Sequence, residues 1–497
     1  MFFSLYPGLS LLAWNIREVE WQIVIRPILA SIVFMLTVFG IFHFVLRDWK
    51  KSSILALIVI LITFSYGHIL SYLQDATIIG KPNRFLVVVD ALVFLVFALW
   101  ILPKIKDLST TISALNWVSV ILIGITLTQI VAYELKDDAQ NTFQGSLVRS
   151  EVDRLPDIYY IILDGYDRAD LLKEMGYDNS DFLQFLRSKG FYVADCSRSN
   201  YRKTVLSVAS ALNMDYIYSY LPNDGFKDTD LDRVINTIRE NRVRAELKSL
   251  GYTDISFNMG YKWATWWDAD LYLPESNRYT AYFDDATLNS FELMYLRTTI
   301  LGPFIDRDII ALNTYSRFFS KGRGHYERVN YILDKLSELI TYPGPKLVYA
   351  HLIVPHGPFV FLPDGSYDPS HGDEIGDDHG ITSERGYLNS VEFINKRMKV
   401  LIDEILKNSN EPPIVLIQAD HSLAADFDDK RFNILNAYYL PNVSEDMLYP
   451  TITPVNSFRI IFNQYFGANF PLLEDKSITS DIGHPYSEIE AEVTACP

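Results

Sequence analysis

The sequence predicts an N-terminal bundle of membrane-spanning helices followed by a three-layer α/β/α domain with a mostly parallel sheet. Two observations lead to this prediction. Four long apolar runs crowd into the first quarter of the 497 residues. The rest of the chain alternates unbroken apolar, β-rich runs with segments of helical periodicity. That alternation is typical of a parallel sheet with helices on both faces.

The four apolar runs are each about as long as a helix that crosses a bilayer core. A buried soluble bundle is the alternative, but its helices would carry a polar face, and residues 54–64 and 85–102 have almost none. A shorter apolar stretch over 2–13 is expected to form a fifth short helix or an interfacial segment, and it lacks the pattern of a signal peptide. The predicted spans are residues 23–46, 53–73, 85–102 and 117–132.

Basic residues in the short loops predict the orientation of these spans. Loops 47–51 and 104–106 both carry them and are expected in the cytoplasm, so the chain after the fourth span lies outside. The basic residues at 81 and 84 oppose this assignment and make the bias modest. The predicted domains are a transmembrane domain over 1–135, a polar linker over 136–155 and a catalytic domain over 156–497.

Charge and cysteine content narrow the partners and the chemistry. A net charge of −17 without a basic cluster argues against nucleic acid as a partner. The two cysteines, Cys196 and Cys496, exclude a disulfide framework and a cysteine-built metal site, and they leave a single bridge open.

Three apolar runs in the later part of the chain each predict a strand buried on both faces. They cover residues 158–163, 346–353 and 413–420, and helical periodicity appears over 179–189 and 382–407. Open α/β sheets bind their ligands beyond the carboxyl ends of the strands, so the polar residues at these ends are candidates for a site.

Two carboxylates and an imidazole stand at these strand ends. Asp164 follows the first strand, and Asp420 and His421 end the third. This set suits a divalent ion when an oxygen nucleophile is near, and manganese, zinc or calcium is expected. Each residue alone has a simpler explanation, because Asp-Gly after a strand is commonly a turn and Asp-His can lie in a solvated loop. The prediction of a metal site therefore rests on the three residues together.

Thr204 is the candidate nucleophile. It begins an apolar helical run, so its hydroxyl is expected at a helix N-terminus, where backbone N–H groups favour an anion. A metal would lower the pKa of the hydroxyl and neutralise charge on a transferred phosphoryl or sulfuryl group. The simpler reading of a threonine at this position is a helix cap.

The motifs occur in a recognisable order: DGY at 164–166, SNYRKTVLS at 199–207, HLIVPHGPF at 351–359 and QADHS at 418–422. This order resembles the sulfatase-type branch of the alkaline phosphatase superfamily. Within that branch it is most similar to membrane-anchored lipoteichoic acid synthases and phosphoethanolamine transferases of bacteria. The resemblance covers most of residues 156–475.

The resemblance implies a role for each matching residue. Asp164, Thr204, Asp420 and His421 would bind the metal, and Thr204 would be the nucleophile that forms a covalent intermediate. His356 resembles the histidine that contacts the substrate's phosphate or sulfate or protonates its leaving group.

Three further residues are candidate substrate contacts. Arg202 and Lys203 stand beside the nucleophile and are expected either to hold an anionic substrate or to be solvated loop charges. His351 is expected either to contact substrate or, slightly favoured, to be a strand-end histidine satisfied by a backbone carbonyl.

One departure from the family separates two chemistries. Sulfatases that use formylglycine carry a C/S-x-P-x-R pattern, whereas residues 204–208 here read TVLSV, without the convertible residue, the proline or the arginine. Phosphoester or phosphodiester chemistry through Thr204 is therefore expected.

The leading prediction is a metal-dependent transferase or hydrolase that moves a phosphoglycerol- or phosphoethanolamine-type group on an envelope lipid or glycan. Its catalytic domain would face away from the cytoplasm of a bacterial inner or plasma membrane, where no nucleotide triphosphate is supplied. Membrane lipids are expected as partners. The alternatives are a sulfuric ester hydrolase without formylglycine and a degenerate envelope binding module, against which the retained residues argue.

Two softer features complete the predictions. Trp263, Trp266 and Trp267 are expected either to cradle a lipid head group or sugar or, as large aromatics more often do, to fill the core. The acidic, glycine-containing stretch at 373–379 is expected to form a mobile flap near the site.

Overall fold

The chain forms two compact units. In this computed structural model one unit comprises residues 1–139 and 278–320, and the other comprises 140–277 and 321–497. The described residues 290–302 therefore group with the N-terminal unit, whereas the sequence prediction had placed them in the catalytic domain. The structure describes residues 2–75, 82–136, 143, 145–147, 155–221, 231–274, 290–302, 322–371, 383–423, 430–481, 484–491 and 496.

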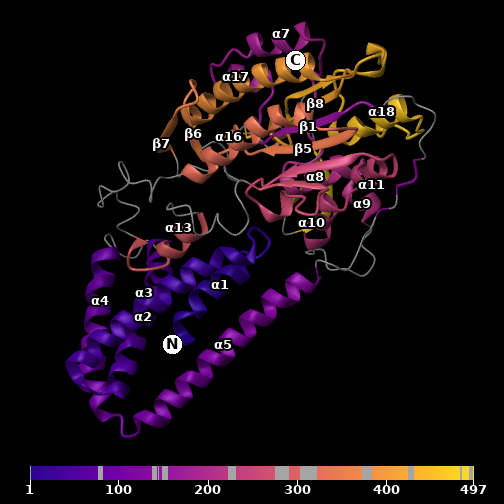
Figure 1. Ribbon diagram of the computed structural model, residues 1–497. Coiled ribbons are helices and arrows are strands. Elements are labelled where there is room, and N and C mark those ends of the chain that lie inside the picture. Colours follow the sequence, from indigo (N-terminus) through magenta and orange to yellow (C-terminus); the bar gives the residue numbers. More distant parts are fainter. Residues whose placement is uncertain are drawn as a thin grey trace. The chain divides into compact units, whose positions relative to one another are not determined.

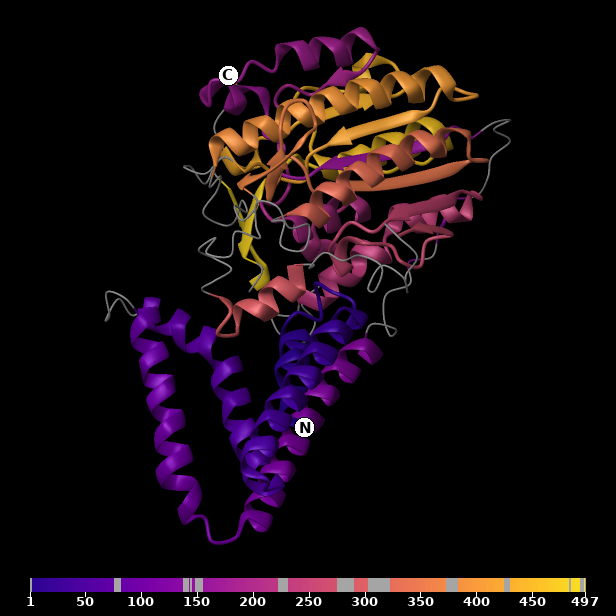
Figure 2. The same ribbon diagram turned by 60° about the vertical axis from the view of Figure 1, so that its left-hand side comes forward.

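Within its described residues, the first unit contains four helices that are long and apolar enough to cross a membrane, as predicted (Figure 2). The fourth begins well before the predicted start at residue 117, and the short apolar stretch near the N-terminus forms a helix of nine residues. The helices are α1 (Tyr6–Trp14), α2 (Ile25–Leu46), α3 (Trp49–Asp75), α4 (Pro82–Val96), which a π-helical turn (Phe97–Ile101) extends, and α5 (Leu108–Lys136).

A helix from the later part of the chain, α13 (Ser290–Arg297), packs within this same unit. Its Phe291 is buried in an apolar cluster with residues of α1 and α5. The Glu292 carboxylate lies 2.9 Å from Nε of Arg26 on α2, and the Tyr295 hydroxyl lies 2.6 Å from that of Ser31. Specific polar contacts thus hold α13 against the spanning helices.

The residues after α13 pair with the backbone of α3. The Gly67 N–H donates to the carbonyl of Thr298 (2.9 Å), and the Thr63 carbonyl accepts from the Ile300 N–H (3.2 Å). These two groups of α3 are four residues apart and are the natural partners of each other in a regular helix. A Cβ at Gly67 would lie 2.3 Å from the Arg297 carbonyl oxygen, so the close approach requires glycine.

The second unit is built on a seven-stranded sheet of order β2-β9-β8-β1-β5-β3-β4. The five strands from β8 to β4 are parallel to one another, and β9 runs antiparallel to β8 and β2. The predicted α/β class with a mostly parallel sheet is therefore confirmed. The strands are β1 (Ile158–Leu163), β2 (Tyr192–Val193), β3 (Thr253–Phe257), β4 (Leu271–Leu273), β5 (Lys346–Leu352), β8 (Ile414–Gln418) and β9 (Asn436–Tyr439).

Helices cover both faces of this sheet (Figure 1). Alternate residues of β1 enter two separate apolar cores, Tyr160 on one face and Tyr159 and Ile161 on the other, as the period of a strand requires. One face is covered by α8 (Thr204–Asn213), α10 (Leu231–Arg239), α11 (Arg242–Ser249) and α18 (Pro454–Phe466). The other face is covered by α7 (Ser180–Ser188), α16 (Arg323–Glu338) and α17 (Glu384–Asn408).

A disulfide joins Cys196 to Cys496 across 300 residues of sequence. It ties the C-terminal end of the chain to the loop that precedes Thr204. The remaining elements include α6 (Ala169–Glu174), α9 (Ile217–Tyr220) and two hairpins, β6 (Phe359–Phe361) with β7 (Tyr367–His371) and β10 (Ile478–Asp481) with β11 (His484–Glu490). The stretch predicted as a flap, 373–379, lies outside the described residues.

Candidate metal centre

Three neighbouring strands bring two acids and a histidine to one edge of the sheet. Asp164 directly follows β1, His351 is the penultimate residue of β5, and Asp420 lies two residues beyond β8. The register aligns these ends, because Ile162 of β1 lies opposite both His351 and Gln418. One ligand atom from each of Asp164, His351 and Asp420 lies within 4.8 Å of the others, and all three residues are buried.

His421 completes this group, and we call Asp164, His351, Asp420 and His421 the strand-end cluster. His351 Nε2 lies 3.2 Å from Asp164 Oδ2. His421 Nε2 lies 3.7 Å from Asp164 Oδ1 and 3.5 Å from Asp420 Oδ2. The Gly165 N–H donates to Asp420 Oδ1 at 3.0 Å, which links the ends of β1 and β8 directly.

Thr204 is the first residue of α8 and lies against the cluster. Its Oγ1 is 3.0 Å from His421 Nε2. The Ser207 hydroxyl, one turn further along α8, donates to the Asp420 carbonyl at 2.6 Å and fixes the start of the helix on the end of β8. Lys203 occupies the N-cap position without a side-chain cap, so the N–H groups of the first turn have no capping side chain.

Three buried polar atoms of the strand-end cluster have no hydrogen-bond partner among the described residues. They are Asp164 Oδ1, Asp420 Oδ2 and His351 Nδ1. A buried carboxylate oxygen without a partner is costly, and a cation satisfies it. Carboxylates, imidazoles and a hydroxyl together are ligands that suit a divalent metal, with zinc or manganese matching the nitrogen donors. The residues present therefore fit a divalent ion.

The titration behaviour of the cluster reflects its crowding. Burial alone would raise the pKa of Asp164, but the neighbouring His356, His351 and His421 outweigh it and hold this pKa well below its usual range. Burial lowers the pKa of His421, yet the carboxylates of Asp420 and Asp164 raise it overall. Asp164 thus favours its charged, metal-binding form.

Hydrogen bonds from residues outside the strand-end cluster hold the loop that carries Asp420. Asp167 Oδ1 accepts hydrogen bonds from the Ser422 hydroxyl (2.6 Å) and the Leu423 N–H (2.7 Å). The Tyr387 hydroxyl donates to the Gly165 carbonyl at 3.0 Å. These supporting residues could not be predicted from the sequence, because no local pattern distinguishes a buried aspartate or tyrosine that orients another loop.

The other candidates lie close to the cluster to different degrees. The His356 N–H donates to the Asp164 carbonyl at 3.0 Å, and its ring centroid is 6.3 Å from that of His421. His351 faces the Asp164 carboxylate rather than a backbone carbonyl, so it joins the candidate ligands. Its position opposite β1 could have been found only from the strand register. Arg202 and Lys203 are half-buried immediately before Thr204.

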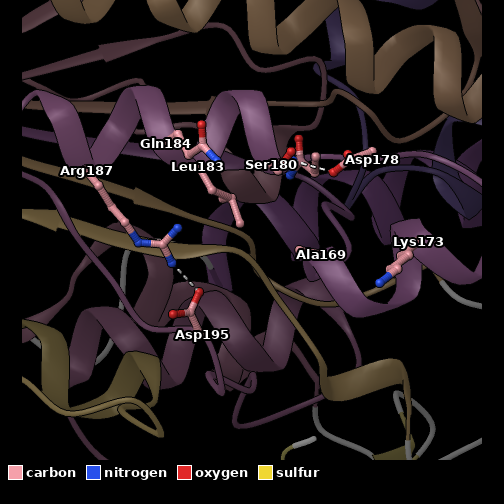
Figure 3. A pocket seen from close by; sticks show the side chains of 9 residues that line it. Ala169, Lys173, Asp178, Ser180, Leu183, Gln184, Arg187 and Asp195 are labelled. Carbon is pink, nitrogen blue, oxygen red and sulfur yellow. Dashed lines mark hydrogen bonds and ion pairs between the residues drawn. The ribbon is translucent and has the colours of Figure 1, made fainter.

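Two further features fall outside the cluster. Trp266 is fully buried and stacks on Tyr349 with ring centroids 4.1 Å apart, so it belongs to the core. A surface cavity of about 210 Å³ is lined by α6, α7 and the segment after β2, with Arg187 2.6 Å from Asp195 across it (Figure 3). None of the predicted site residues lines this cavity.

Fold and site together define an α/β protein with membrane-spanning helices and a candidate metal centre at the carboxyl edge of its sheet. No family model and no curated protein match the chain. The C-terminal periplasmic domain of EcEptC from Escherichia coli is similar, with 13% identity and a TM-score of 0.43 over 70% of this chain and 96% of that one.

Two other solved structures show the same kind of similarity. The integral membrane protein lipooligosaccharide phosphoethanolamine transferase A from Neisseria meningitidis has 12% identity and a TM-score of 0.36, over 88% of this chain and 86% of that one. A protein in the alkaline phosphatase superfamily from Vibrio parahaemolyticus has 12% identity and a TM-score of 0.37, over 69% and 74%. At these low values the chemistry of the site has to be argued from its own residues.

Proposed function

We propose that this chain is a membrane-anchored, metal-dependent enzyme that transfers or hydrolyses a phospho-substituent on an envelope lipid or glycan. The group moved would be of the phosphoglycerol or phosphoethanolamine type. One observation carries the proposal. The Thr204 hydroxyl stands at the uncapped start of α8, 3.0 Å from His421 Nε2, beside buried carboxylates with unsatisfied oxygens.

The residues of the strand-end cluster would hold the metal together with Thr204. When bound, a divalent ion supplies positive charge that lowers the pKa of a nearby hydroxyl and offsets negative charge on the transferred group. The N–H groups at the start of α8 would donate to the oxygens of that group. His421 would orient Thr204, and Arg202 and Lys203 would attract the anionic substrate.

The reaction would proceed in two displacements. The Thr204 hydroxyl releases its proton to solvent and its oxygen attacks phosphorus, while a P–O bond to the leaving group breaks and His356 protonates the departing oxygen. Water or an acceptor hydroxyl then attacks the phosphothreonine ester and gives its proton to His356. The P–O bond to Thr204 breaks, and the Thr204 oxygen regains a proton from solvent. A covalent intermediate of this kind divides one difficult step into two easier ones.

Location supports lipid-borne substrates. The Cys196–Cys496 disulfide is typical of an oxidising compartment, and the basic loops 47–51 and 104–106 favour the cytoplasmic side. The second unit would then lie outside the cytoplasm of an inner or plasma membrane. Lipids and glycans of the envelope are the phosphorylated compounds within reach there.

The test is metal content together with hydrolysis of aryl phosphomonoesters, phosphodiesters and sulfates by the full chain in detergent. Metal-dependent phosphodiester cleavage is expected, with a loss of about a thousandfold or more in Thr204→Ala and Asp420→Ala. Thr253→Ala, at the opposite end of the sheet, is the matched control and should keep full activity. Preferred release of sulfate would favour a sulfatase, and protein without metal or activity would favour a binding module.

A further inference from the structure

The start of α16 lies beside the loop that carries His356. Its N-cap residue, Gly322, adopts φ 65° and gives the helix no side-chain cap. A Cβ at Gly322 would lie 2.7 Å from Val360 and 3.2 Å from Pro358, so the helix start packs directly on the segment after His356. The His356 N–H in turn donates to the Asp164 carbonyl. The uncapped end of α16 is thus linked by two contacts to the strand-end cluster.

His325, the third residue of α16, directs an unsatisfied group into this turn. The residue is 9% exposed, and its buried Nε2 has no hydrogen-bond partner among the described residues. Side chains of a helix tilt toward its N-terminus, so the His325 side chain leans toward the start of α16. An edge contact with Phe361 (centroids 5.7 Å apart) holds the ring in place. A buried ring nitrogen that has no partner among the described residues is arranged to meet a ligand.

Arg328 brings positive charge to the same edge of the sheet. A Cβ at Gly260 would lie 2.5 Å from Arg328 Nη1, so the guanidinium rests on the loop that follows β3, the strand beside β5. Burial, together with the nearby Arg328 and His356, lowers the pKa of His325 to about 3, although Asp164 opposes them. The imidazole is therefore neutral at physiological pH, and it lies within electrostatic reach of the strand-end cluster.

We infer that the first turn of α16, with His325 and Arg328, forms a second anion subsite next to the metal centre. It would bind a phosphate or carboxylate of the substrate other than the group transferred at Thr204, and in this respect the inference rests on the proposed function. Helix N–H groups, a ring N–H and a guanidinium all donate to an oxyanion. The first turn of α16 carries no acid, and Glu327, which follows it, is paired with Arg323 at 2.7 Å.

Such a subsite would select substrates with two anionic groups. A phosphorylated lipid or glycan can place one group at Thr204 and the other at His325, whereas a simple phosphodiester leaves the subsite empty. The subsite would act as a positioning device, because it holds a part of the substrate that does not react.

The first experiment measures binding and needs no activity. Inorganic phosphate is titrated into the full chain in detergent, with metal removed by EDTA, and binding is followed by 31P line broadening. We expect binding to persist without metal, to weaken about fivefold or more in His325→Leu and Arg328→Gln, and to remain in Asp420→Ala. Lys335→Gln, near the opposite end of α16, is the matched control and should bind like the wild type.

Three results would overturn the inference: no phosphate binding to the metal-free chain, loss of that binding in Asp420→Ala, or undiminished binding in both subsite variants. If His325→Leu fails to fold, Arg328→Gln decides alone, because its side chain is only half-buried.

The second experiment compares kcat/KM for two phosphodiesters that differ by one additional phosphate. In Arg328→Gln the preference for the doubly anionic substrate should fall about tenfold, while kcat/KM for the other changes less than about twofold. An equal fall for both would indicate a general structural role and contradict the inference. If the wild type cleaves neither phosphodiester, the proposed function is contradicted. The phosphate titration then tests the subsite on its own.

Discussion

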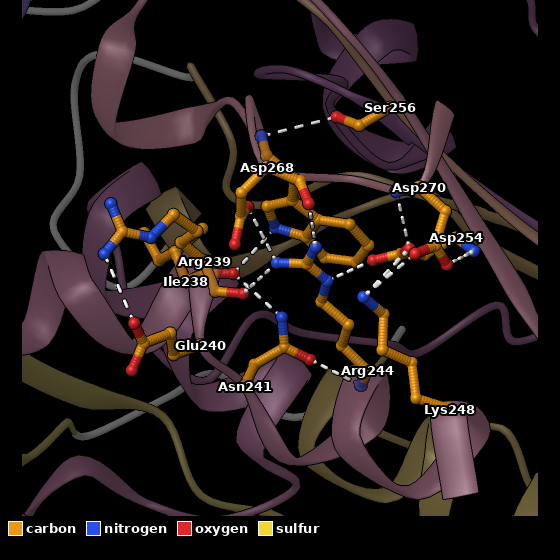
Figure 4. Close-up of polar contacts among 11 residues, drawn as sticks. Ile238, Arg239, Glu240, Asn241, Arg244, Lys248, Asp254, Ser256, Asp268 and Asp270 are labelled. Carbon is orange, nitrogen blue, oxygen red and sulfur yellow. Dashed lines mark hydrogen bonds and ion pairs between the residues drawn. The ribbon is translucent and has the colours of Figure 1, made fainter. Parts of the chain in front are cut away.

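Two groups of buried charged residues in the second unit differ in whether each carboxylate oxygen has a hydrogen-bond partner. At the amino ends of β3 and β4, an arginine cluster surrounds Asp254 (Figure 4). Its Oδ2 accepts from Arg244 Nε, while its Oδ1 accepts from the Asp270 N–H at 2.9 Å and lies 3.3 Å from Lys248 Nζ. Arg244 also donates to Asp268 at 2.9 Å. Both oxygens of this buried carboxylate therefore have partners.

The strand-end cluster contains acids that are as deeply buried, but each has an oxygen that accepts no hydrogen bond from the described residues, with His421 Nε2 only at 3.7 Å from Asp164 Oδ1 and 3.5 Å from Asp420 Oδ2. Asp164 and Asp420 are 4% and 3% exposed, and Asp254 is 1% exposed. Burial alone therefore does not separate a structural acid from a functional one. The comparison teaches that matched oxygens stabilise the fold, whereas unmatched oxygens at a strand end are held ready for a ligand.

The largest expected effect is a loss of activity when an acid of the strand-end cluster is replaced. Asp420→Asn should reduce kcat/KM on a phosphodiester by about a thousandfold or more, because a metal ligand is lost. The metal-free protein should not melt at a lower temperature than the wild type, because an unmatched buried charge is removed. Kinetics and thermal unfolding in EDTA measure both quantities. A clear loss of stability would show that Asp420 is already satisfied without metal.

Substitution of Asp254, whose two carboxylate oxygens both have partners, should lower stability and leave activity unchanged. Asp254→Asn should lower the free energy of unfolding by about 3 kcal/mol, because it leaves the buried guanidinium of Arg244 with only Asp268 as a carboxylate partner. At a temperature where the variant is folded, kcat/KM should stay within about twofold of the wild type. Denaturant unfolding followed by circular dichroism measures the first quantity. An inactive but stable variant would reverse the comparison.

Added metal should sharpen the contrast between the two groups. A divalent ion at a hundred times its dissociation constant should stabilise the wild type by about 2.7 kcal/mol. Asp254→Asn should gain as much, and Asp420→Asn should gain little. Thermal shifts with manganese or zinc, measured against EDTA, test this. An equal shift in all three proteins would place the bound ion elsewhere.

Acid should reduce the contribution of Asp254 to the stability of the fold over a defined range of pH. Burial would raise the pKa of Asp254, but hydrogen bonding with Asp270 and the charge of Arg244 lower it to about 2. A carboxyl whose folded pKa is depressed stabilises the fold fully above its unfolded pKa, near 4, and loses this contribution as the pH falls toward 2. The stability advantage of the wild type over Asp254→Asn should therefore shrink by about 1.7 kcal/mol between pH 5 and pH 2.5. A constant difference would contradict the assignment.

The smallest effect should come from a matched pair on the surface. Arg187 and Asp195 are 2.6 Å apart, but both are more than 40% exposed. Asp195→Asn should change the free energy of unfolding by less than about 0.5 kcal/mol. A larger loss would mean that the cavity in Figure 3 contributes more to stability than its exposure implies.

The sequence predicted what local periodicity encodes. The four spans, the buried strands β1, β5 and β8, and the helices α7 and α17 follow from the spacing of apolar residues. Asp164 and Asp420 could be located because they end such strands. Thr204 lies against the strand-end cluster in the structure, with its hydroxyl 3.0 Å from His421 Nε2, and its role as nucleophile stays a proposal.

Other features depend on contacts between distant residues. The inclusion of His351 depends on the register between β5 and β1, and the position of His325 depends on how α16 packs. The return of α13 to the first unit depends on the Arg26–Glu292 pair, which no pattern within either segment reveals. The disulfide was left open because two cysteines 300 residues apart pair only if the fold brings them together.

The placement of residues 278–320 has a practical consequence for dissecting the protein. The chain passes between its two units three times, near residues 139, 277 and 320. A protease cut in the polar stretch before β1 would therefore leave the second unit attached to the membrane by the remaining crossings. A soluble fragment that begins at residue 156 would carry α13 with its apolar face uncovered and should aggregate. Replacing residues 278–320 by a short polar connection should yield a soluble second unit.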